Sequence, residues 1–296
     1  MWLFRKSIDL NQAVARPVQA TDLTAATRLL REAGRRYYAM TGADLEHLMA
    51  QQWGAVLEVG TTMVAIALAN QPAEGICWIY AVALGDGLDL RSALATLLPV
   101  FDATLRRQGV YTIFYAGDEQ ADPWLVPALQ AQQFEPETEV VVYEKRQLHI
   151  PHQGNLAITV RPALPLDLPA VLAVDRACFE PQWTKDATIM RTALEQGPYV
   201  VVAEHGEAIV GYAYATTHFG GRLVHLVRIA VDPAWRGKAI GVRLLADVVD
   251  FTIAQRAHVL TLNTQAYNMQ AQRLYQWFGF VTTGERQLIL RRNLHP

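Results

Sequence analysis

The sequence predicts a mixed α/β (α+β) fold made of two halves that share one order of helices and strands. A repeated motif gives the first evidence: Arg16-Pro17 precedes Asp22-Leu23, and Arg161-Pro162 precedes Asp167-Leu168 at the same spacing. Helical and strand-like apolar periods then follow each motif in the same order. The length of 296 residues suits about two domains that each bury a core.

Composition narrows the class of protein. Hydrophobic residues make up 51% and charged residues 18% of the chain, which excludes a disordered, collagen-like or coiled-coil protein. The formal net charge of −2, from 26 basic and 28 acidic residues, supplies no overall basic field for nucleic acid. We therefore expect a small molecule or a peptide as the partner, and no nucleic acid.

The cysteines and the apolar runs indicate the compartment. Cys77 and Cys178 lie far apart, and the sequence has no Cys-x-x-Cys motif and no histidine cluster with metal-ligand spacing. The N-terminal apolar residues give way to Arg5 and Lys6 before a signal peptide develops. The longest apolar stretches, such as residues 63–69, are too short to span a bilayer. We expect a cytoplasmic protein without metal or membrane association, and the oligomeric state stays open.

The first half is expected to begin with a helix and to end with a strand, with a hairpin-like pair of strands after the first helix. The expected elements are a helix at 24–35, strands at 55–59, 63–69 and 76–83, a helix at 90–107, a strand at 110–115, a helix at 123–132 and a strand at 139–144.

The second half repeats this order, and Asp167 is expected to cap its first helix. Residues 146–155 interrupt the periodicity with proline, glycine and polar residues, so we expect a boundary near residue 153 and domains at 1–150 and 156–296. The further expected elements are strands at 199–204, 208–217 and 223–231, a helix at 237–256, a strand at 259–263, a helix at 268–278 and a strand at 287–291.

The most informative segment follows the strand at 223–231, where a turn that contains glycines opens a helix. The free N–H groups and the positive end of a helix start can hold an anion, and basic side chains add charge. The alternative is a plain turn with solvated basic residues. The segment matches neither the GxxxxGK[ST] loop nor the GxGxxG motif of nucleotide-binding proteins. The residues of this turn are Arg236, Gly237, Lys238, Ala239, Ile240 and Gly241.

A second constellation lies on the helix expected at 268–278. Asn268, Ala271 and Tyr275 have the spacing i, i+3, i+7 and so share one helix face, with Asn268 as a good N-cap. The phenol of Tyr275 is suited to protonate a leaving thiolate, because the pKa values of the two groups, about 10 and about 8.5, are close. The alternative is a capped helix with a tyrosine at the edge of the core.

Together these segments resemble the GNAT superfamily of acetyl-CoA-dependent N-acetyltransferases, over residues 158–292. The resemblance implies two tandem GNAT-like domains, each a mixed, mostly antiparallel sheet flanked by helices. The family pattern Arg/Gln-x-x-Gly-x-Gly/Ala holds the CoA pyrophosphate with backbone amides. Ala239 stands where that pattern has its first glycine, and we expect it in the first helical turn. The resemblance assigns pairing with the pantetheine arm to Ile229, Ala230 and Val231. It assigns two roles to Tyr275, contact with the cofactor and general acid. The further cofactor contacts are Arg236, Gly237, Lys238, Ala239, Ile240, Gly241 and Asn268.

The acceptor amine must lose a proton, so a base is expected. Asn263 stands where relatives that acetylate protein N-termini carry a catalytic Glu, and an amide cannot act as a base. Alternation along the strand places His225 on one face with Val227, Ile229 and Val231, where other GNAT relatives carry a carboxylate base. His225 is therefore the candidate base, against the alternative of a histidine that fills a sheet edge.

The substrate is less well specified. The segment from Cys178 to Thr184 resembles the loop that borders the peptide entrance of the ribosomal-protein alanine N-acetyltransferases. Phe179 and Trp183 are thus candidates for substrate contact, although both residue types also serve as core anchors. His218 and Glu204 are secondary candidates.

The first half lacks the basic turn. Residues 80–91 carry Asp86 and Asp89, which would repel a pyrophosphate, and Asp122 and Leu129 stand where the second half has Asn268 and Tyr275. We expect a degenerate GNAT-like domain without cofactor. The layout is similar to that of mycothiol synthase, a tandem protein whose second half carries the active site.

The function expected from this resemblance is transfer of an acetyl group from acetyl-CoA to a primary amine by direct attack in a ternary complex. The amine belongs to a peptide or protein N-terminus or to a small molecule. Two alternatives stay open: a non-catalytic acyl-CoA-binding sensor or interaction module, and a small-thiol biosynthetic enzyme similar to mycothiol synthase.

Overall fold

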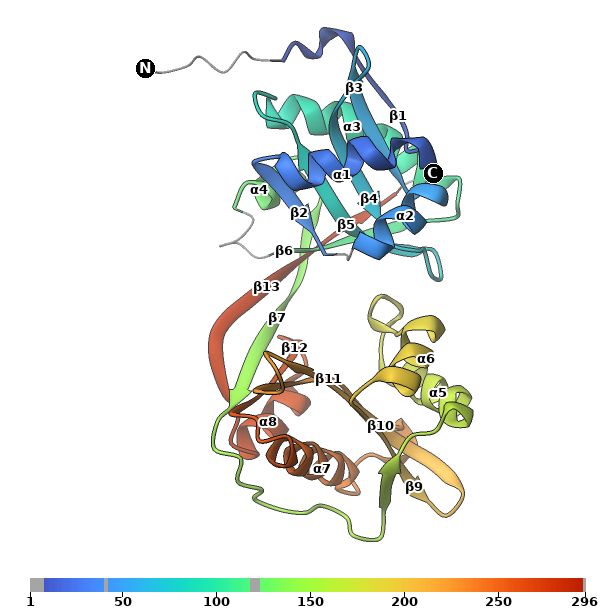
Figure 1. Ribbon diagram of the computed structural model, residues 1–296. Helices are drawn as coiled ribbons and strands as arrows, with labels where there is room; N and C mark the ends of the chain where they lie inside the picture. Colours follow the sequence, from blue (N-terminus) through green and yellow to red (C-terminus); the bar gives the residue numbers. More distant parts are fainter. Residues whose placement is uncertain (1–7, 40–41, 118–122, 295–296) are drawn as a thin grey trace. The chain divides into compact units, whose positions relative to one another are not determined.

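The computed structural model describes residues 8–39, 42–117 and 123–294 and divides into two compact units, each a sheet flanked by helices (Figure 1). Unit 1 comprises Met1–Thr138 and Gln287–Pro296, and unit 2 comprises Glu139–Arg286. The predicted mixed α/β fold is confirmed, with strands that pair mostly antiparallel in both units.

Unit 1 contains one core cluster beneath its helices. Its strands pair in the order β1-β3-β4-β5-β6-β13, where β13 is Val281–Asn293, and β2 also pairs with β5. Among the described residues of this unit, only β5 and β6 run parallel. The elements are β1 (Ala13–Pro17), α1 (Leu23–Glu32), β2 (Arg35–Tyr38), α2 (Gly42–Ala50), β3 (Gly54–Val59), β4 (Thr62–Ala69), β5 (Ile76–Leu84), α3 (Leu90–Arg106), β6 (Thr112–Gly117) and α4 (Leu125–Gln130).

Unit 2 has two core clusters, with α7 and α8 on one face of the sheet and α5 and α6 on the other. Its strands pair in the order β7-β12-β11-β10-β9-β8, and only β11 and β12 run parallel. The elements are β7 (Glu135–Lys145), β8 (Thr159–Pro162), α5 (Leu168–Cys178), α6 (Ala187–Gln196), β9 (Tyr199–His205), β10 (Ala208–His218), β11 (Leu223–Val231), α7 (Ile240–Ala254), β12 (Val259–Gln265), α8 (Met269–Trp277) and β13 (Val281–Asn293).

Each expected helix and strand is present near its expected position. The structure also contains a strand, β2, and a helix, α6, that the apolar periodicity of the sequence does not predict. The strand β2 has four residues, of which only Tyr37 is buried. The helix α6 is capped by Asp186 and buries only Met190 and Ala193. A short strand and a helix with so narrow an apolar face leave little periodic signal in the sequence.

The closing strands divide the chain differently from the expected boundary near residue 153. Residues 140–145 of β7 pair with β12 in unit 2, and residues 288–293 of β13 pair with β6 in unit 1. The compact units therefore separate at residues 138/139 and 286/287, so that the strand that closes each half of the repeat completes the sheet of the other unit. Apolar alternation predicts a strand but carries no information about which sheet it joins.

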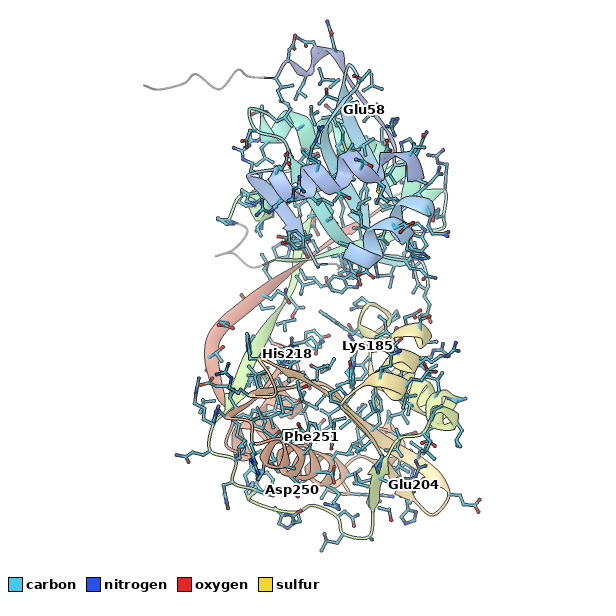
Figure 2. The ribbon with its side chains drawn as sticks, in the orientation of Figure 1. Glu58, Lys185, Glu204, His218, Asp250 and Phe251 are labelled. Carbon is cyan, nitrogen blue, oxygen red and sulfur yellow. The ribbon has the colours of Figure 1, made fainter. Side chains whose placement is uncertain are left out.

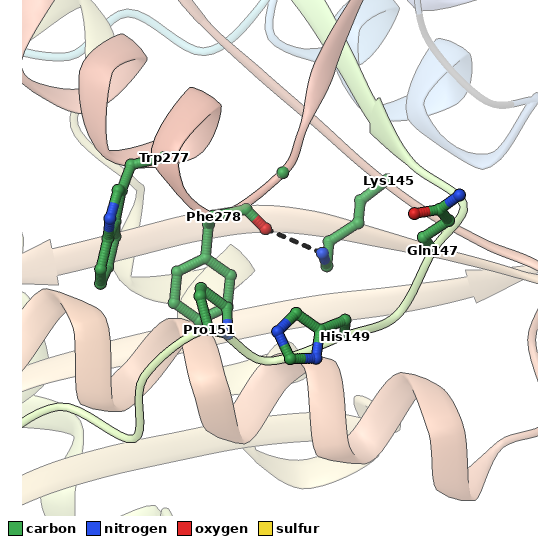
Figure 3. Close-up of a pocket in the computed structure, with 7 residues that line it drawn as sticks. Lys145, Gln147, His149, Pro151, Trp277 and Phe278 are labelled. Carbon is green, nitrogen blue, oxygen red and sulfur yellow. Dashed lines mark hydrogen bonds between the residues drawn. The ribbon is translucent and has the colours of Figure 1, made fainter.

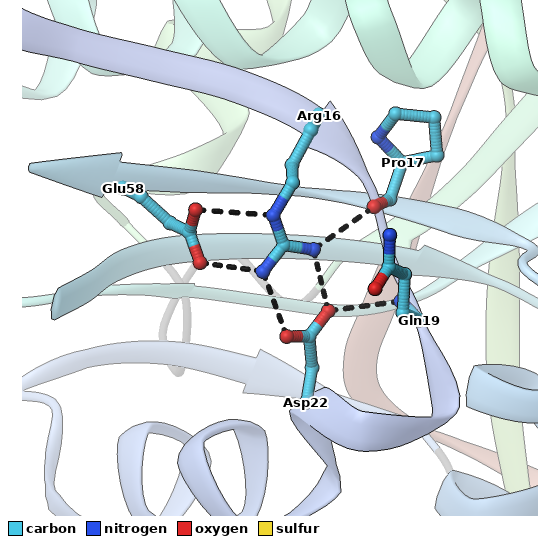
Figure 4. A network of polar contacts seen from close by, with 5 residues as sticks. All are labelled: Arg16, Pro17, Gln19, Asp22 and Glu58. Carbon is cyan, nitrogen blue, oxygen red and sulfur yellow. Dashed lines mark hydrogen bonds and ion pairs between the residues drawn. The ribbon is translucent and has the colours of Figure 1, made fainter. Parts of the chain in front are cut away.

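The repeated Arg-Pro and Asp-Leu motif forms the same ion-pair network in both units. In unit 1, Arg16 binds Asp22 at 2.7 Å and Glu58 at 2.5 Å (Figure 4). In unit 2, Arg161 binds Asp167 at 2.7 Å and Glu204 at 2.5 Å. Each arginine thus ties the start of the first helix to a strand of the hairpin, which gives the motif a structural role and places Glu204 in an ion pair.

The aspartates of the two networks also hold the turn before the helix. The Asp22 carboxylate accepts the Gln19 N–H at 2.8 Å, and that of Asp167 accepts the Leu164 N–H at 2.7 Å. The expected N-cap bond from Asp167 to α5 is not formed, because this carboxylate is directed backward to Leu164 and Arg161. Hydrogen bonding to Arg161 lowers the pKa of Asp167 below its usual value, against the opposing effect of burial.

Replacement of Arg161 by Met should destabilise the protein by about 2 kcal/mol, because it leaves two carboxylates close together without a cation. Urea unfolding followed by circular dichroism measures the loss. The matched control is Arg146→Met, since the Arg146 side chain is 68% exposed in its pair with Glu144. Loss of that pair should cost less than about 0.5 kcal/mol.

The same comparison has a pH dependence. The folded pKa of Asp167 is lowered, so its pair with Arg161 contributes stability above the ordinary pKa and loses it as the pH falls through the folded value. The difference between wild type and Arg161→Met should therefore shrink below about pH 4. Equal stability of the two proteins at pH 7 would contradict the structural role of this motif.

Candidate functional site

Strands β11 and β12 separate in the middle of the sheet of unit 2. They pair in parallel only from Leu223–Leu226 to Val259–Leu262. Beyond Leu226, β11 pairs on its β10 side, and β12 continues beside β7. Within the described part of the chain, the second edge of β11 at residues 227–231 carries no strand, and this edge includes Ile229, Ala230 and Val231.

The corresponding edge in unit 1 is filled by the chain itself. Strand β5 pairs in parallel with β6 only at residues 76–78, as β11 does with β12. Past this point β2 pairs antiparallel with residues 81–84 of β5. The Tyr37 side chain of β2 is buried, and its hydroxyl donates to the Ala116 carbonyl at 3.0 Å, which ties β2 to β6 as well.

The helix that follows each edge also begins differently in the two units. In unit 1, the Asp89 carboxylate accepts the Ser92 N–H at 2.8 Å and caps α3. In unit 2, α7 has no side-chain cap. Of the other residues singled out in the first half, Leu129 is buried in α4, whereas Asp122 lies outside the described residues.

The turn before α7 presents a row of free backbone donors. No described residue accepts a hydrogen bond from the backbone N–H groups of residues 237–242. Ala239 is expected in the first helical turn, but it precedes α7 as its N-cap, with φ +55°. This left-handed conformation costs an L-residue about 1–2 kcal/mol and costs glycine almost nothing, which explains the glycine of the family pattern.

The residues before β8 support this turn from outside. Asn155 donates its side-chain Nδ2 to the Lys238 carbonyl at 3.1 Å and its backbone N–H to the Ala239 carbonyl at 3.3 Å. A Cβ on Gly154 would lie 2.3 Å from the backbone nitrogen of Arg243, so the backbone there lies directly against α7. The expected linker therefore helps to fix the left-handed turn.

The two basic side chains of the turn contact their neighbours. Lys238 Nζ lies 4.1 Å from the centre of the Trp235 ring, and Arg236 Nε donates to the Val231 carbonyl at 3.4 Å. Cys178 Sγ lies 3.2 Å from the same carbonyl. At Gly241, an added Cβ would have its nearest contacts at 3.7 and 3.8 Å, so this glycine is not required by local packing.

Helix α8 brings Tyr275 under the sheet. The expected N-cap is confirmed, because Asn268 Oδ1 accepts the Ala271 N–H at 3.3 Å. The Tyr275 side chain is buried beside Tyr143 and Phe280, and no described residue forms a hydrogen bond with its hydroxyl. Burial raises the pKa of Tyr275, and the charge of Arg228 acts in the opposite direction.

The other end of α8 is capped by a lysine from β7. Lys145 donates Nζ to the Phe278 carbonyl at 2.8 Å (Figure 3). Lys145 is only 3% exposed as a whole residue, and burial lowers its pKa. Lys145 borders a small cavity of about 140 Å³ and compensates the negative C-terminal end of the helix that carries Tyr275. The remaining residues around this cavity are Gln147, His149, Pro151, Trp277, Phe278 and Gly279.

His225 lies on the opposite face from the one that simple alternation predicts. Thr216 pairs with His225 and Tyr214 with Arg228, while Val227 has no partner on β10. This β-bulge adds one residue and reverses the alternation. His225 therefore shares a face with Arg228 and not, as expected, with Ile229 and Val231.

The hydrogen bonds of His225 favour one tautomer. Nδ1 lies 2.9 Å from Thr261 Oγ1, and Thr261 donates to the Val224 carbonyl at 3.4 Å. With the hydroxyl proton directed to Val224, the Thr261 oxygen accepts the Nδ1 proton and Nε2 carries the lone pair. Burial, and then the charges of His218 and Lys185, lower the pKa of His225, so the ring is neutral at pH 7.

Two residues proposed for substrate contact lie beside Arg228. The Phe179 ring lies 4.0 Å from the Arg228 guanidinium, and the Trp183 carbonyl accepts a hydrogen bond from Arg228 at 2.6 Å. His218, the third candidate, is exposed at the end of β10, and its Nε2 lies 2.9 Å from Thr216 Oγ1. Phe179 thus stacks on a cation that the sequence reasoning missed.

The buried carboxylate of Asp175 organises this face. It accepts hydrogen bonds from the Tyr212 hydroxyl at 2.5 Å and the Lys185 backbone N–H at 2.7 Å, and one oxygen lies 3.6 Å from Arg228 Nε. A charged residue at a buried helical position, opposite an arginine in an apolar strand, is the sequence signal that could have revealed this cluster. The described residues contain no group of three metal-ligating side chains and no helix long and apolar enough to cross a membrane.

Comparison with known proteins supports the expected family. Residues 168–280 match the model of the acetyltransferase (GNAT) family. N-alpha-acetyltransferase RimI of Mycobacterium tuberculosis is 36% identical over 99 residues, which are 31% of this chain and 58% of RimI. The spore coat polysaccharide biosynthesis protein SpsD of Bacillus subtilis is 30% identical over 33% of this chain, and human N-acetylaspartate synthetase is 33% identical over 24%. The matches span about a third of SpsD and about a quarter of the synthetase.

Solved structures share the fold over almost the whole chain. A GCN5-related N-acetyltransferase from Sphaerobacter thermophilus has a TM-score of 0.61 at 18% identity and is covered over 97% of both chains. A tandem GNAT protein from the clavulanic acid biosynthesis pathway has a TM-score of 0.62 at 14% identity and is covered over 96% of this chain and 99% of its own. Residues 168–280 of the second unit therefore match the GNAT acetyltransferase family, and the chain shares its fold with a tandem GNAT protein.

Proposed function

We propose that unit 2 transfers an acetyl group from acetyl-CoA to a primary amine by direct attack in a ternary complex. Membership of the GNAT family indicates acyl transfer from an acyl-CoA to an amine. The observation that carries the proposal is the separation of β11 from β12, which leaves a free strand edge that leads into a turn with six free amides at residues 237–242.

The free edge and the turn suit two parts of acetyl-CoA. The edge formed by Ile229, Ala230 and Val231 offers backbone groups to the amides of the pantetheine arm, as a neighbouring strand would, except at the Val231 carbonyl, which accepts from Arg236 Nε. The amides of residues 237–242, with the side chains of Arg236 and Lys238, suit the pyrophosphate. Asn268, at the start of α8, is assigned to the cofactor on the family resemblance.

Two side chains are assigned to the proton transfers. The amine nitrogen attacks the thioester carbonyl carbon, and His225 Nε2 accepts the proton that the nitrogen gives up, directly or through water. The carbon–sulfur bond then breaks and the electron pair leaves with sulfur. Burial keeps the Tyr275 phenol protonated, so it is available to donate to the departing thiolate.

Unit 1 is assigned no acetyl-CoA. Its corresponding edge is paired with β2, and Asp89 occupies the N-terminal amide of α3 that an anion would need. A ligand would have to displace both a strand and a carboxylate. One acetyl-CoA should therefore bind per chain.

A non-catalytic acyl-CoA-binding protein is the second candidate. It is favoured by one observation: exposed Asn263 occupies the place of the catalytic Glu and has no proton-accepting group. Binding of acetyl-CoA without turnover across a broad panel of amines would support this function instead.

Calorimetric titration with acetyl-CoA should give one site per chain. Gly241→Glu should weaken binding at least about tenfold, because it places a carboxylate beside the free amides, where it repels phosphate. Asp86→Ala in unit 1 is the matched control and should leave binding unchanged. Ala239→Gly should bind at least as tightly as wild type, since it removes the left-handed strain. Two sites per chain would contradict the assignment of unit 1.

Tyr275→Phe should lower kcat by about 100-fold, the usual size of a general-acid effect, and leave the affinity for acetyl-CoA unchanged. Release of CoA thiol with the best acceptor measures kcat. Tyr143→Phe is the matched control, because its hydroxyl binds Gln272 at 3.1 Å and has no assigned role in the reaction. If both variants turn over at the wild-type rate, Tyr275 is not the acid.

His225→Gln should lose rate most at low pH and recover part of it at high pH, where more of the amine is deprotonated without help. The folded pKa of His225 is lowered, so the wild-type base stays neutral and active down to below about pH 6.5. The measurement is kcat/KM from pH 5.5 to 9.5. The control is His258→Gln, at an exposed position after α7, which should keep the wild-type pH profile of kcat/KM. If His225→Gln also keeps the wild-type profile, His225 is not the base.

A further inference from the structure

Basic side chains gather on the face of unit 2 that carries His225. Arg228 lies on this face with His225, because their partners Tyr214 and Thr216 are two residues apart on β10. His218 continues the same row on β10 and contacts Thr216. The loop between α5 and α6 adds Lys185, and Figure 2 labels Lys185 on this loop and His218 at the end of β10.

The loop that carries Lys185 is fixed to this face at two points. The Asp175 carboxylate accepts the Lys185 N–H at 2.7 Å, and Arg228 donates to the Trp183 carbonyl at 2.6 Å. These bonds hold the backbone on both sides of residue 184, so the point from which the Lys185 side chain extends is set by the core of unit 2. Phe179, at the start of the same loop, covers the Arg228 guanidinium.

The ammonium group of Lys185 forms no direct ion pair in the described part of the chain. No described carboxylate pairs with it and no described acceptor bonds its Nζ, although the residue is half-buried. The nearest carboxylate of this cluster, Asp175, already receives the Tyr212 hydroxyl, the Lys185 N–H and the Arg228 charge. The carboxylate that acts on the charge of Lys185 is therefore shared with Arg228 and with two hydrogen-bond donors.

The charges of these side chains act on one another. Burial and the charge of Arg228, against the opposing charge of Asp175, lower the pKa of Lys185 to about 8. The charges of His218 and Lys185 both lower the pKa of His225. A half-buried group of like charges is unfavourable in the free protein and becomes favourable when an anion binds.

We propose that the acceptor amine carries a carboxylate, and that Lys185 and His218 bind this carboxylate while the amine faces His225 Nε2. This inference rests on the proposed transfer to an amine and narrows the class of amine. Lys185 is a positioning residue here, because it binds a part of the acceptor that does not react. A free amino acid and a peptide with an acidic first residue both present the required chemistry.

The test compares acceptors that differ only in this charge. Aspartate and glutamate are paired with their side-chain amides, and acidic dipeptides with the matching Asn or Gln dipeptides. We expect kcat/KM to be at least about tenfold higher for the acids, mostly through a lower KM. A larger preference among the free amino acids would identify a free amino acid as the acceptor, and a larger preference among the dipeptides would identify a peptide.

The variants separate a specific contact from a general basic field. Lys185→Met should raise KM for the acids at least about tenfold, and leave KM for the amides and the affinity for acetyl-CoA unchanged. Lys185→Arg should keep most of the preference, because it keeps the charge. Arg222→Met removes a cation from the turn after β10 and should leave the preference intact. Equal use of acids and amides by wild type, or an equal loss for both in Lys185→Met, would overturn the inference.

A binding measurement keeps this inference distinct from the proposed transfer. The acids are titrated calorimetrically into protein saturated with CoA, first with wild type and then with Lys185→Met. Binding that depends on Lys185 without turnover of any amine would refute acetyl transfer and support the acidic ligand. Turnover of neutral amines without preference for acids would support acetyl transfer and refute the acidic acceptor.

Discussion

The separation of β11 from β12 after Leu226 is the constraint on which the arrangement of unit 2 depends. Parallel strands that stop pairing leave backbone donors and acceptors on one edge, and these groups need a partner or water. On its other edge β12 pairs with β7, whose last residue, Lys145, caps α8. The free strand edge, which leads into the turn with free amides, is therefore a consequence of this one change in pairing.

The two units solve this constraint in opposite ways. In unit 1, β5 separates from β6 in the same manner, but β2 fills the edge and Asp89 caps the next helix. In unit 2 neither device is present among the described residues, and the left-handed Ala239 directs its neighbours' amides away from internal partners. Free polar groups near the core cost stability unless water or a ligand satisfies them, so the two copies differ in what this strand edge and turn require.

The order of helices and strands could be predicted because each long element has an apolar period of its own. The features that the sequence did not reveal depend on pairing between distant segments. The bulge at Val227 reverses the face of His225, and only the register with β10 shows it. The exchange of β7 and β13 between the units depends on which sheet edge accepts each strand. The sequence also does not show that Lys185 and Arg228 both contact Asp175, because Asp175 lies on another element.

The charged side chains of the two units differ in how far the protein itself neutralises them. Arg16 and Arg161 each bind two carboxylates, so their charge is neutralised within the repeat itself. Around Asp175 the balance is reversed, because one carboxylate faces Arg228 and Lys185. A core that needed only to fold would gain by replacing Lys185 with an apolar residue, since a half-buried cation without a partner is costly. Its presence next to His225 is explained if the missing negative charge arrives with the substrate.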